Sequence, residues 1–470
     1  MRTVSTEEEL AAVLTGGAER IVVRGEVALG RSVQLLPGQR LAGAGDDAAL
    51  VFAADVDGVR VGRDNDVTGL RIQVDPHRRA VFNDTTVDNL GTIRLTGIST
   101  LGQVQILARD GVRGGHVLVD GLDIGAADVR DRAERPALLG VGALQGAFTL
   151  WNQQLDDQVV VTAELRGITA GRAEAPVRGS GVFVAGAEPD GSRGQLAVSV
   201  LDTGPIFTDG GIANGSHDRI SGGVFVVYGA HVREVINHGP VTTYGVNDMV
   251  LDNWGVVDDW SAYAPLTSHG PSGVGFVNFG SIATLRIQAP VETHGVGARG
   301  FNVYRLDDFV GPTVDRVEFD RITTHGDAAI GIQIGQPIGQ LIIRNGIHTE
   351  GGPGDSLVRG VITRLSAHAL SVQAGGRVEA VQVGGPLASS GAGVAAVDVR
   401  GEIATMQVAG GISAAGADAD ALLLEGGTLG LRDTDVTASD GVAIRLTDNA
   451  AIRLSGVQAH GTHGDVVVEQ

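Results

Sequence analysis

Two groups of aspartates near the middle of the chain have the residue type and spacing that acid–base catalysis requires. Asp252 lies in the segment LDNW, and Asp258 and Asp259 follow in VVDDW. Two carboxyl groups roughly 5–9.5 Å apart can protonate a leaving oxygen and activate water at a glycosidic bond. We therefore predict that Asp252 and one of the paired aspartates are a general acid and base, with Tyr244 and Asp248 as further catalytic candidates. Paired aspartates also form ordinary solvated turns, and this alternative remains open.

Aromatic side chains recur beside these carboxylates at regular intervals. Trp254, Phe279 and Tyr304 are 25 residues apart, and Tyr228 lies 26 residues before Trp254. Flat apolar rings next to amides and carboxylates suit the C–H faces and hydroxyl groups of sugars. We predict a saccharide-binding groove over residues 228–333, in which the substrate-binding candidates are Trp254, Trp260, Tyr228, Phe279, Asn302, Tyr304, Asp308, His325 and Gln333.

Histidine recurs between a hydroxyl residue and a glycine. The triplets are Ser268-His269-Gly270, Thr293-His294-Gly295 and Thr324-His325-Gly326. His269 and His294 are candidates for acid–base catalysis, and the alternative roles of the column are a stacked ladder at a turn and a metal site. Zinc needs ligands that converge within about 2.1 Å of one ion. Because the side chains of one column run parallel, we expect a ladder that frames the groove, and we predict no metal ligand.

The glycine that ends each triplet marks a sequence repeat. The strands of this repeat must position the candidate aspartates, aromatic residues and histidines. The glycine recurs at Gly245, Gly270, Gly295, Gly326 and Gly351, and again at positions 391, 416 and 441. Two short alternating apolar runs precede each triplet and a third follows it. Three short strands per ~25 residues predict an all-β fold, a right-handed parallel β-helix (solenoid) of about 17–18 rungs, with residues 1–470 as one domain. Between 351 and 391, residues 361–373 could supply the extra length.

Alternation along the strand after each triplet assigns its side chains to two sides. The residues expected to point inward are Leu251, Phe276, Phe301 and Ile332, with Asn253 and Asn278 as an inward amide ladder. The residues expected to point outward are Asp252, Trp254, Asn302, Tyr304 and Gln333. Residues 254–270 break the pattern, so we expect a loop there that extends over the groove.

The N-terminal residues 1–17 predict a short helix that caps the first rung. Ser5 is expected as the N-cap with Glu8 as its capping-box partner, and Gly16 and Gly17 are expected to end the helix. Such a cap would cover strand edges that are otherwise free to aggregate.

The capping segment, together with VVRGEV, LLPGQRLAGAG and VTGLRI, resembles the right-handed parallel β-helix superfamily of pectate lyases and polygalacturonases. The resemblance is one of architecture and covers nearly the whole chain. The order Asp252-Asn253, Asp258-Asp259 and His269-Gly270 is similar to the motifs of polygalacturonases, but it is compressed into about one rung and has no lysine motif. This departure disfavours polyuronate substrates. No cofactor is predicted, and calcium, which pectate lyases bind through aspartates, is the alternative.

The charge balance and two missing residue types exclude several classes of function. With 35 basic and 55 acidic residues the net charge is −20, which argues against nucleic acid, anionic membranes and polyanionic glycans as partners. Every basic residue is an arginine, so Schiff-base chemistry is excluded, and the lack of cysteine excludes thiolate nucleophiles. No apolar run has the length of a signal peptide or a membrane span, so we expect a cytoplasmic protein.

Together these features predict a carbohydrate-active enzyme, specifically a glycoside hydrolase that acts on a neutral or weakly charged oligosaccharide. A polysaccharide lyase or a sugar-rearranging transferase in the same groove is the first alternative. A non-catalytic glycan-binding or structural solenoid is the second. Flat faces of such a solenoid could also pack into a homotrimer.

Overall fold

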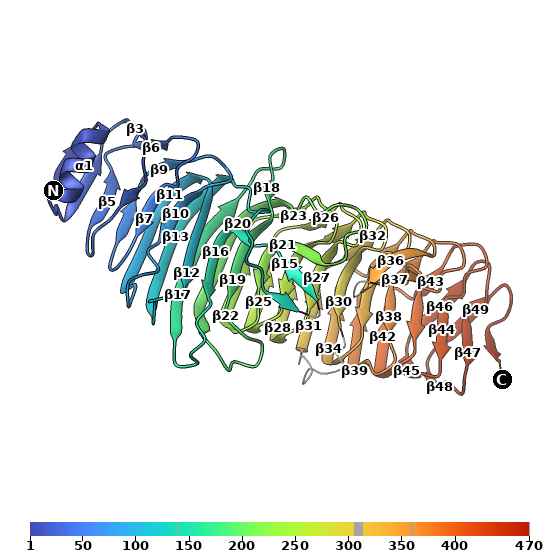
Figure 1. The fold of residues 1–470 in the computed structure, drawn as a ribbon. Coiled ribbons are helices and arrows are strands. Elements are labelled where there is room, and N and C mark those ends of the chain that lie inside the picture. The colour runs from blue at the N-terminus through green and yellow to red at the C-terminus, as the bar shows by residue number, and fades with distance from the viewer. Residues whose placement is uncertain (139, 305–313, 359–360, 470) are drawn as a thin grey trace.

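The sequence repeat folds as three short strands on three faces of an elongated stack (Figure 1). The computed structural model describes residues 1–138, 140–304, 314–358 and 361–469, and these residues form one helix and fifty strands. The repeat that begins at residue 281 contains β28 (Ser281–Ile287), β29 (Val291–Thr293) and β30 (Arg299–Val303). The prediction of an all-β, solenoid-like stack of parallel strands is confirmed.

On each face, neighbouring strands pair in parallel with their equivalents in the next repeat, and the pairs β24–β27 and β26–β29 keep an offset of 25 residues. Near the middle of the stack, face 1 contains β22 (Ala230–Asn237), β25 (Val256–Ala262), β28, β31 (Val314–Phe319) and β34 (Pro337–Ile343). Face 2 contains β23 (Val241–Thr243), β26 (Leu266–Ser268), β29, β32 (Ile322–Thr324) and β35 (Ile347–Thr349). Face 3 contains β21 (Arg219–Val226), β24 (Asp248–Asn253), β27 (Val274–Asn278), β30 and β33 (Ile330–Ile334).

Nearer the N-terminus, several strands continue without a break across faces 1 and 2. Examples are β13 (Gly115–Ala126), β17 (Val160–Ala170) and β20 (Gln195–Asp209), and the last of these pairs with both β22 and β23. Face 3 continues there through β10 (Arg79–Asn83), β12 (Gln103–Ala108), β16 (Gly146–Asn152) and β19 (Ser180–Ala185).

One apolar core runs through the inside of the stack. The predicted inward residues Leu251, Phe276, Phe301 and Ile332 are all completely buried in it. The predicted amide ladder is also present, because Asn253 Nδ2 donates to Asn278 Oδ1 at 2.8 Å. The period-2 alternation of a strand therefore assigned the two sides of face 3 correctly.

The corner between faces 2 and 3 explains the repeated glycine. A side chain at Gly270 or Gly295 would collide with the carbonyl oxygen of the equivalent glycine one repeat earlier. The left-handed backbone conformation is found two residues after the corner glycine. Asn247 follows Gly245 and Ser272 follows Gly270, with φ of 56° and 55°. The triplet does mark a corner, as predicted, but glycine is required there because successive backbones touch.

The helix α1 (Glu7–Thr15) begins one residue later than expected. Thr6 is the N-cap, and its hydroxyl accepts a hydrogen bond from the backbone N–H of Glu9 at 3.2 Å. The Glu9 carboxylate in turn accepts the backbone N–H of Ser5 at 2.7 Å. Thr6 and Glu9 have the same spacing as Ser5 and Glu8, so the sequence pattern allowed both registers.

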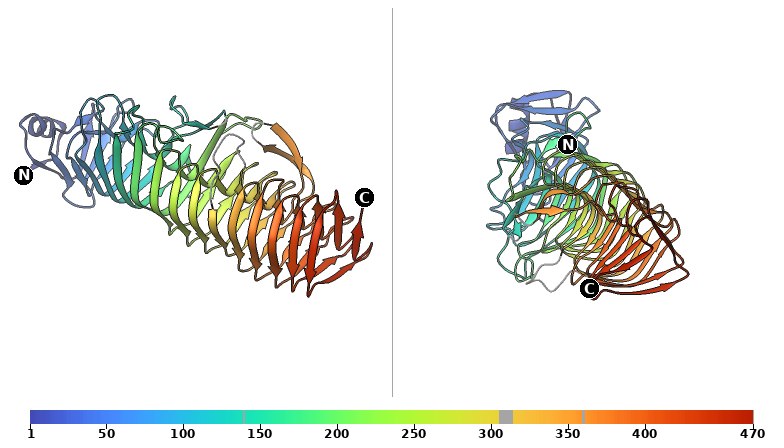
Figure 2. Two further views of the ribbon diagram at one scale, coloured as in Figure 1. Left: turned by 90° about the horizontal axis from the view of Figure 1, so that it is seen from below. Right: turned by 90° about the vertical axis from the view of Figure 1, so that its right-hand side faces the viewer.

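Two excursions leave the stack on the side of face 3 (Figure 2). The first, residues 128–145, contains β14 (Ala137–Leu138) and β15 (Val141–Ala143), and β15 pairs with the start of β21. The second is the hairpin of β36 (Gly354–Val358) and β37 (Val361–Leu365).

Two predictions about irregular segments are corrected. Residues 361–373 were predicted to supply the extra length between 351 and 391. The extra length instead includes the whole hairpin of β36 and β37, and β38 (Leu370–Val372), which falls within 361–373, is a regular strand of face 3. Residues 254–270 do not form a loop over the groove, because they contain the regular strands β25 and β26. Their alternation was obscured by Trp260, which points inward as a completely buried core residue. In the described part of the chain, no helix has the length and apolar character needed to cross a membrane.

Candidate functional site

The outward positions of face 3 form a polar column that is hidden from solvent. One register column of face 3 contains Asp252 on β24, Val277 on β27, Asn302 on β30 and Gln333 on β33. Val277 is its one apolar member among these four. Asp252 and Asn302 are at most 1% exposed, and Gln333 is 8% exposed. A side chain that points away from the core is normally solvated, but here Leu138 and Val141 of the first excursion line one cavity with Asp252, and Ser356 of the second excursion contacts Arg299 on β30.

A cavity of about 90 Å³, which we call the Asp252 cavity, lies between face 3 and the first excursion. Its apolar lining consists of Leu138, Val141, Ile220, Met249, Trp254, Val274, Val277, Phe279 and Tyr304. Its polar lining consists of His217, Arg219, Asn247, Asp252, Ser272 and Arg299. A mainly apolar pocket with a few placed polar groups is the usual form of a small-ligand site.

The carboxyl group of Asp252 is the most unusual group in this cavity. It is completely buried, and neither oxygen has a hydrogen-bond partner among the described residues. Burial therefore raises its pKa well above the ordinary value, and the nearby indole N–H of Trp254 opposes this shift only in part. A buried, neutral carboxyl group is a proton donor that can act as a general acid.

Arg299 is a second buried polar group of the cavity and is 1% exposed. Its guanidinium donates to Gln333 Oε1 at 3.0 Å, to the carbonyl of Gly297 at 3.0 Å and to Ser356 Oγ of the hairpin at 3.2 Å. All three acceptors are neutral. The cavity therefore combines a carboxyl group of raised pKa with a guanidinium group whose contacts include no carboxylate in the described part of the chain.

Arg299 was missed by sequence reasoning, although a signal for it existed. It occupies the register position of Met249 on β24 and Val274 on β27. An arginine in a column whose other members are apolar stands out once the repeat has been aligned.

The predicted aromatic column is present, and three of its rings line the cavity. Phe279 stacks on Tyr304 with ring centroids 4.8 Å apart and an angle of 16°, and Trp254 meets Phe279 edge-on at 6.2 Å. Tyr228 has a different place. Its hydroxyl oxygen accepts the backbone N–H of Ala137 at 3.2 Å, so it holds the first excursion against face 3.

The structure does not bring Asp258 or Asp259 to Asp252. Both lie on β25 of face 1, whereas Asp252 lies on face 3. Asp258 pairs with His231 at 2.9 Å, and Asp259 pairs with Arg286 at 2.7 Å. The predicted acid–base pair is therefore not assembled, because the chain turns the corner from face 3 to face 1 between these positions. Trp260 cannot bind substrate from the core, where its indole N–H donates to Asn237 Oδ1 at 2.8 Å.

Asp248 lies at the corner between faces 2 and 3 and does not line the cavity. Its carboxyl group accepts hydrogen bonds from Ser221 Oγ and from the backbone N–H groups of Gly210 and Gly245. Burial outweighs these bonds and raises its pKa to about 6. Its contacts indicate a role in joining the chain at this corner.

The histidine column is stacked as expected, but it lies on the corner and not in the cavity. Tyr244 stacks on His269 at 5.2 Å, His269 on His294 at 4.9 Å, and His294 on His325 at 4.7 Å. Burial and the charge of His294 lower the pKa of His269. Asp308, the remaining residue predicted to bind substrate, lies outside the described residues.

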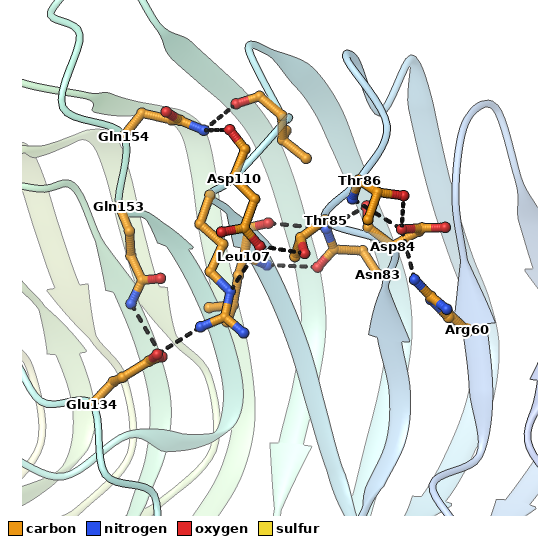
Figure 3. Close-up of polar contacts among 12 residues, drawn as sticks. Arg60, Asn83, Asp84, Thr85, Thr86, Leu107, Asp110, Glu134, Gln153 and Gln154 are labelled. Carbon is orange, nitrogen blue, oxygen red and sulfur yellow. Dashed lines mark hydrogen bonds and ion pairs between the residues drawn. The ribbon is translucent and has the colours of Figure 1, made fainter.

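A second cavity, of about 270 Å³, lies on face 3 at the N-terminal side of the first excursion. We call it the arginine cavity, and its lining consists of Arg79, Gln105, Leu107, Arg109, Arg132, Ala133, Glu134 and Gln145. Figure 3 shows its surroundings, in which Glu134 contacts Gln153 at 3.5 Å and Asn83 is bonded to the backbone of Leu107.

The two cavities lie along the same side of the stack. Gln105 and Asp252 belong to one register column and are four strands apart, which is about 19 Å at the usual spacing of neighbouring strands. In the arginine cavity, Arg132 donates to Gln103 Oε1 at 2.9 Å and to the carbonyl of His77. It has no ion pair with a carboxylate in the described part of the chain. Sequence reasoning missed this cavity, because its residues come from three separated segments.

Comparison of the chain with family models, with curated proteins and with solved structures gave no match.

Proposed function

We propose that this protein is a carbohydrate-active enzyme whose reaction takes place at the Asp252 cavity. The proposal rests on one observation above all: a completely buried carboxyl group without a partner among the described residues faces a cavity lined by Trp254, Phe279 and Tyr304. Perturbed titratable groups in a cavity are typical of active sites. Aromatic faces beside hydrogen-bonding groups are suited to a sugar ring.

Asp252 would act as the general acid on a glycoside. Its neutral form donates its proton to the glycosidic oxygen while the bond from that oxygen to the anomeric carbon breaks. Water then adds to the anomeric carbon, and its proton restores the acid. Arg299 would donate to a sugar oxygen, and the stacked rings of Phe279 and Tyr304 would contact the C–H face of the sugar.

The ligand is expected to extend from the Asp252 cavity along face 3 to the arginine cavity. Guanidinium and amide groups of Arg79, Gln105 and Arg132 offer hydrogen bonds to sugar hydroxyls. A neutral or weakly charged oligosaccharide fits this combination, because the whole chain carries a net charge of −20.

The experiment compares Asp252→Asn with Asp258→Asn. A glycan screen with the wild-type protein first identifies an oligosaccharide that binds, and its cleavage is then measured for each variant. We expect Asp252→Asn to lose turnover by at least ~100-fold while its Kd stays within a few-fold. Asp258→Asn, changed at an exposed site on face 1, should cleave at the wild-type rate.

Two results would contradict this function. Full turnover in Asp252→Asn would show that the acid lies elsewhere. If the wild-type protein bound no saccharide in the screen, the carbohydrate proposal itself would be wrong.

A second candidate is a non-catalytic glycan-binding protein. It is favoured by one observation: Asp252 is the only carboxyl group that lines the Asp252 cavity within the described residues. Most glycosidases use two carboxyl groups. A binding protein would hold the same oligosaccharide without cleaving it, and Asp252→Asn would then change the affinity alone.

The finer features of the architecture are also proposals. We infer that the stack is a right-handed coil of about 17–18 turns, similar to the pectate lyase and polygalacturonase superfamily. The three-strand repeat and the helix α1 at the first turn support this interpretation.

A further inference from the structure

Near its C-terminal end, the histidine ladder carries carboxylates beside its rings. His294 and His325 are parallel within 6°, with ring centroids 4.7 Å apart. Glu292 comes from β29, two residues before His294, and Glu350 follows β35 in the corner column of His325. These side chains are between 29% and 46% exposed, so a small solute can reach them.

Both ring nitrogens of His325 face a carboxylate. Its Nδ1 is 2.8 Å from Glu350 Oε2, and its Nε2 is 2.9 Å from Glu292 Oε1. A neutral imidazole has one N–H and one lone pair. If Nδ1–H donates to Glu350, Nε2 of the neutral ring directs its lone pair at the Glu292 carboxylate, so either a proton or a metal ion on Nε2 stabilises this contact.

We propose that Glu292, His294 and His325 bind a divalent transition metal, with zinc as the representative ion. Their ligand atoms lie within 4.8 Å of one another, and Glu292 Oε1 is 3.6 Å from His294 Nε2. Two imidazoles and one carboxylate are a common ligand set for zinc, with a water molecule in the fourth position. A proton on Nε2 of His325 would also satisfy the contact with Glu292, and a bound metal takes the place of that proton between the two groups.

Glu350 has a second role in this site. A histidine that binds a metal through one nitrogen usually donates its other N–H to a carboxylate or a carbonyl group. Glu350 accepts at Nδ1 of His325, which leaves Nε2 free to face Glu292 and His294. This contact fixes the ring orientation that metal binding needs.

Binding requires a small movement of the rings. Bonds of about 2.1 Å to one ion bring the two imidazole nitrogens to within about 3.5 Å of each other, so His294 and His325 must tilt from their parallel stack. Both rings are partly exposed, which allows this tilt.

Among the described residues, Glu292, His294 and His325 are the one group of three such side chains whose ligand atoms all lie within 4.8 Å of one another. At the equivalent of Glu292 the neighbouring repeats carry Thr267 and Thr323. His269 is stacked on Tyr244 and His294, and among the described residues it has no ion pair with a carboxylate. His269 is therefore a matched control, because it has the same place in the corner without the carboxylate.

The test is titration of the full-length protein with ZnCl₂ by isothermal calorimetry after treatment with a chelator. We expect one saturable site in the wild-type protein and at least ten-fold weaker binding in Glu292→Gln, His294→Ala and His325→Ala. Glu292→Gln keeps the ladder intact, so it separates loss of a ligand from misfolding. His269→Ala should bind zinc as the wild-type protein does.

Cobalt provides a second readout that does not depend on any catalytic activity. Co²⁺ bound by two imidazoles and a carboxylate should give visible absorption bands, and Glu292→Gln should abolish them. The proposal is overturned if the wild-type protein shows no saturable binding of Zn²⁺, or if His269→Ala weakens binding as much as His325→Ala. These outcomes are independent of whether the Asp252 cavity binds a sugar.

Discussion

At the scale of the residue, the outer side of face 3 holds two buried polar groups without an opposite charge among the described residues. Asp252 has no hydrogen-bond partner there, and Arg299 donates to neutral acceptors only. Burial is costly both for a polar group without a hydrogen bond, such as the Asp252 carboxyl, and for a charged group without a paired charge, such as the Arg299 guanidinium. A fold that keeps such groups beside a cavity gives up stability there, which is the usual mark of a site shaped for a ligand.

The pKa of Asp248 makes a prediction about stability. In the unfolded chain an aspartate ionises near pH 4, whereas burial raises the pKa of Asp248 in the folded protein to about 6. Between about pH 4 and pH 6 the Asp248 carboxyl binds a proton in the folded state but has lost it in the unfolded state. The free energy of unfolding therefore falls as the pH rises through this range. A shift of two units corresponds to about 3 kcal/mol. We expect Asp248→Asn to remove this loss in urea denaturation curves recorded from pH 4 to pH 7.

Asp252 also makes the free energy of unfolding fall with rising pH, because burial raises its pKa as well. The variant with both substitutions should therefore show the flattest profile. If Asp248→Asn lost stability with rising pH as steeply as the wild-type protein, a different group would have to titrate in this range.

At the scale of the element, the corner between faces 2 and 3 sets the spacing of the strands. Its glycines stack so closely that a Cβ at Gly351 would meet the carbonyl oxygen of Gly326, whereas a Cβ at the adjacent Gly352 would meet only Asp327 Oδ1 at 3.5 Å. Neither glycine has a positive φ. The two positions therefore differ in packing and not in backbone conformation.

This contrast predicts different effects for two neighbouring substitutions. Gly351→Ala should lower the free energy of unfolding by about 2–3 kcal/mol, because the backbones must move apart to accept the methyl group. Gly352→Ala should change it by less than about 1 kcal/mol. Both values are measured by chemical denaturation, and equal effects would mean that close stacking does not determine the choice of glycine.

At the scale of the whole molecule, each turn of the stack contacts mainly the turns before and after it. Such a chain has open strand edges at its ends, which need protection. At the N-terminal end β1 (Arg2–Val4) pairs with β2 (Arg20–Val23), and α1 buries Leu10 against the core. The cap therefore covers both the edge and the end of the core.

Removal of residues 1–17 tests this function of the cap. The truncated protein should expose β2 and self-associate, because an unprotected parallel edge can pair with a second copy. Size-exclusion chromatography with light scattering should show larger particles than for the full-length chain at the same concentration. An unchanged mass would show that the first strands protect themselves.

The sequence by itself determined the repeat, the inward side of each strand and the columns on the outward side. It could do so because a parallel stack places equivalent residues of successive repeats next to each other, and local alternation decides which side they face. The inward place of Phe276, the stacking of His294 on His325 and the column of Trp254, Phe279 and Tyr304 all followed from this rule.

The tertiary structure alone decided which groups meet across faces and what covers them. Asp258 is six residues from Asp252 in sequence but lies on a different face, and Arg299 is far in sequence but shares the cavity. The cavity beside Asp252 is also lined by Leu138 and Val141 of the first excursion, which come more than a hundred residues earlier in the chain. Such contacts arise from side chains of distant segments, whose placement no local spacing encodes.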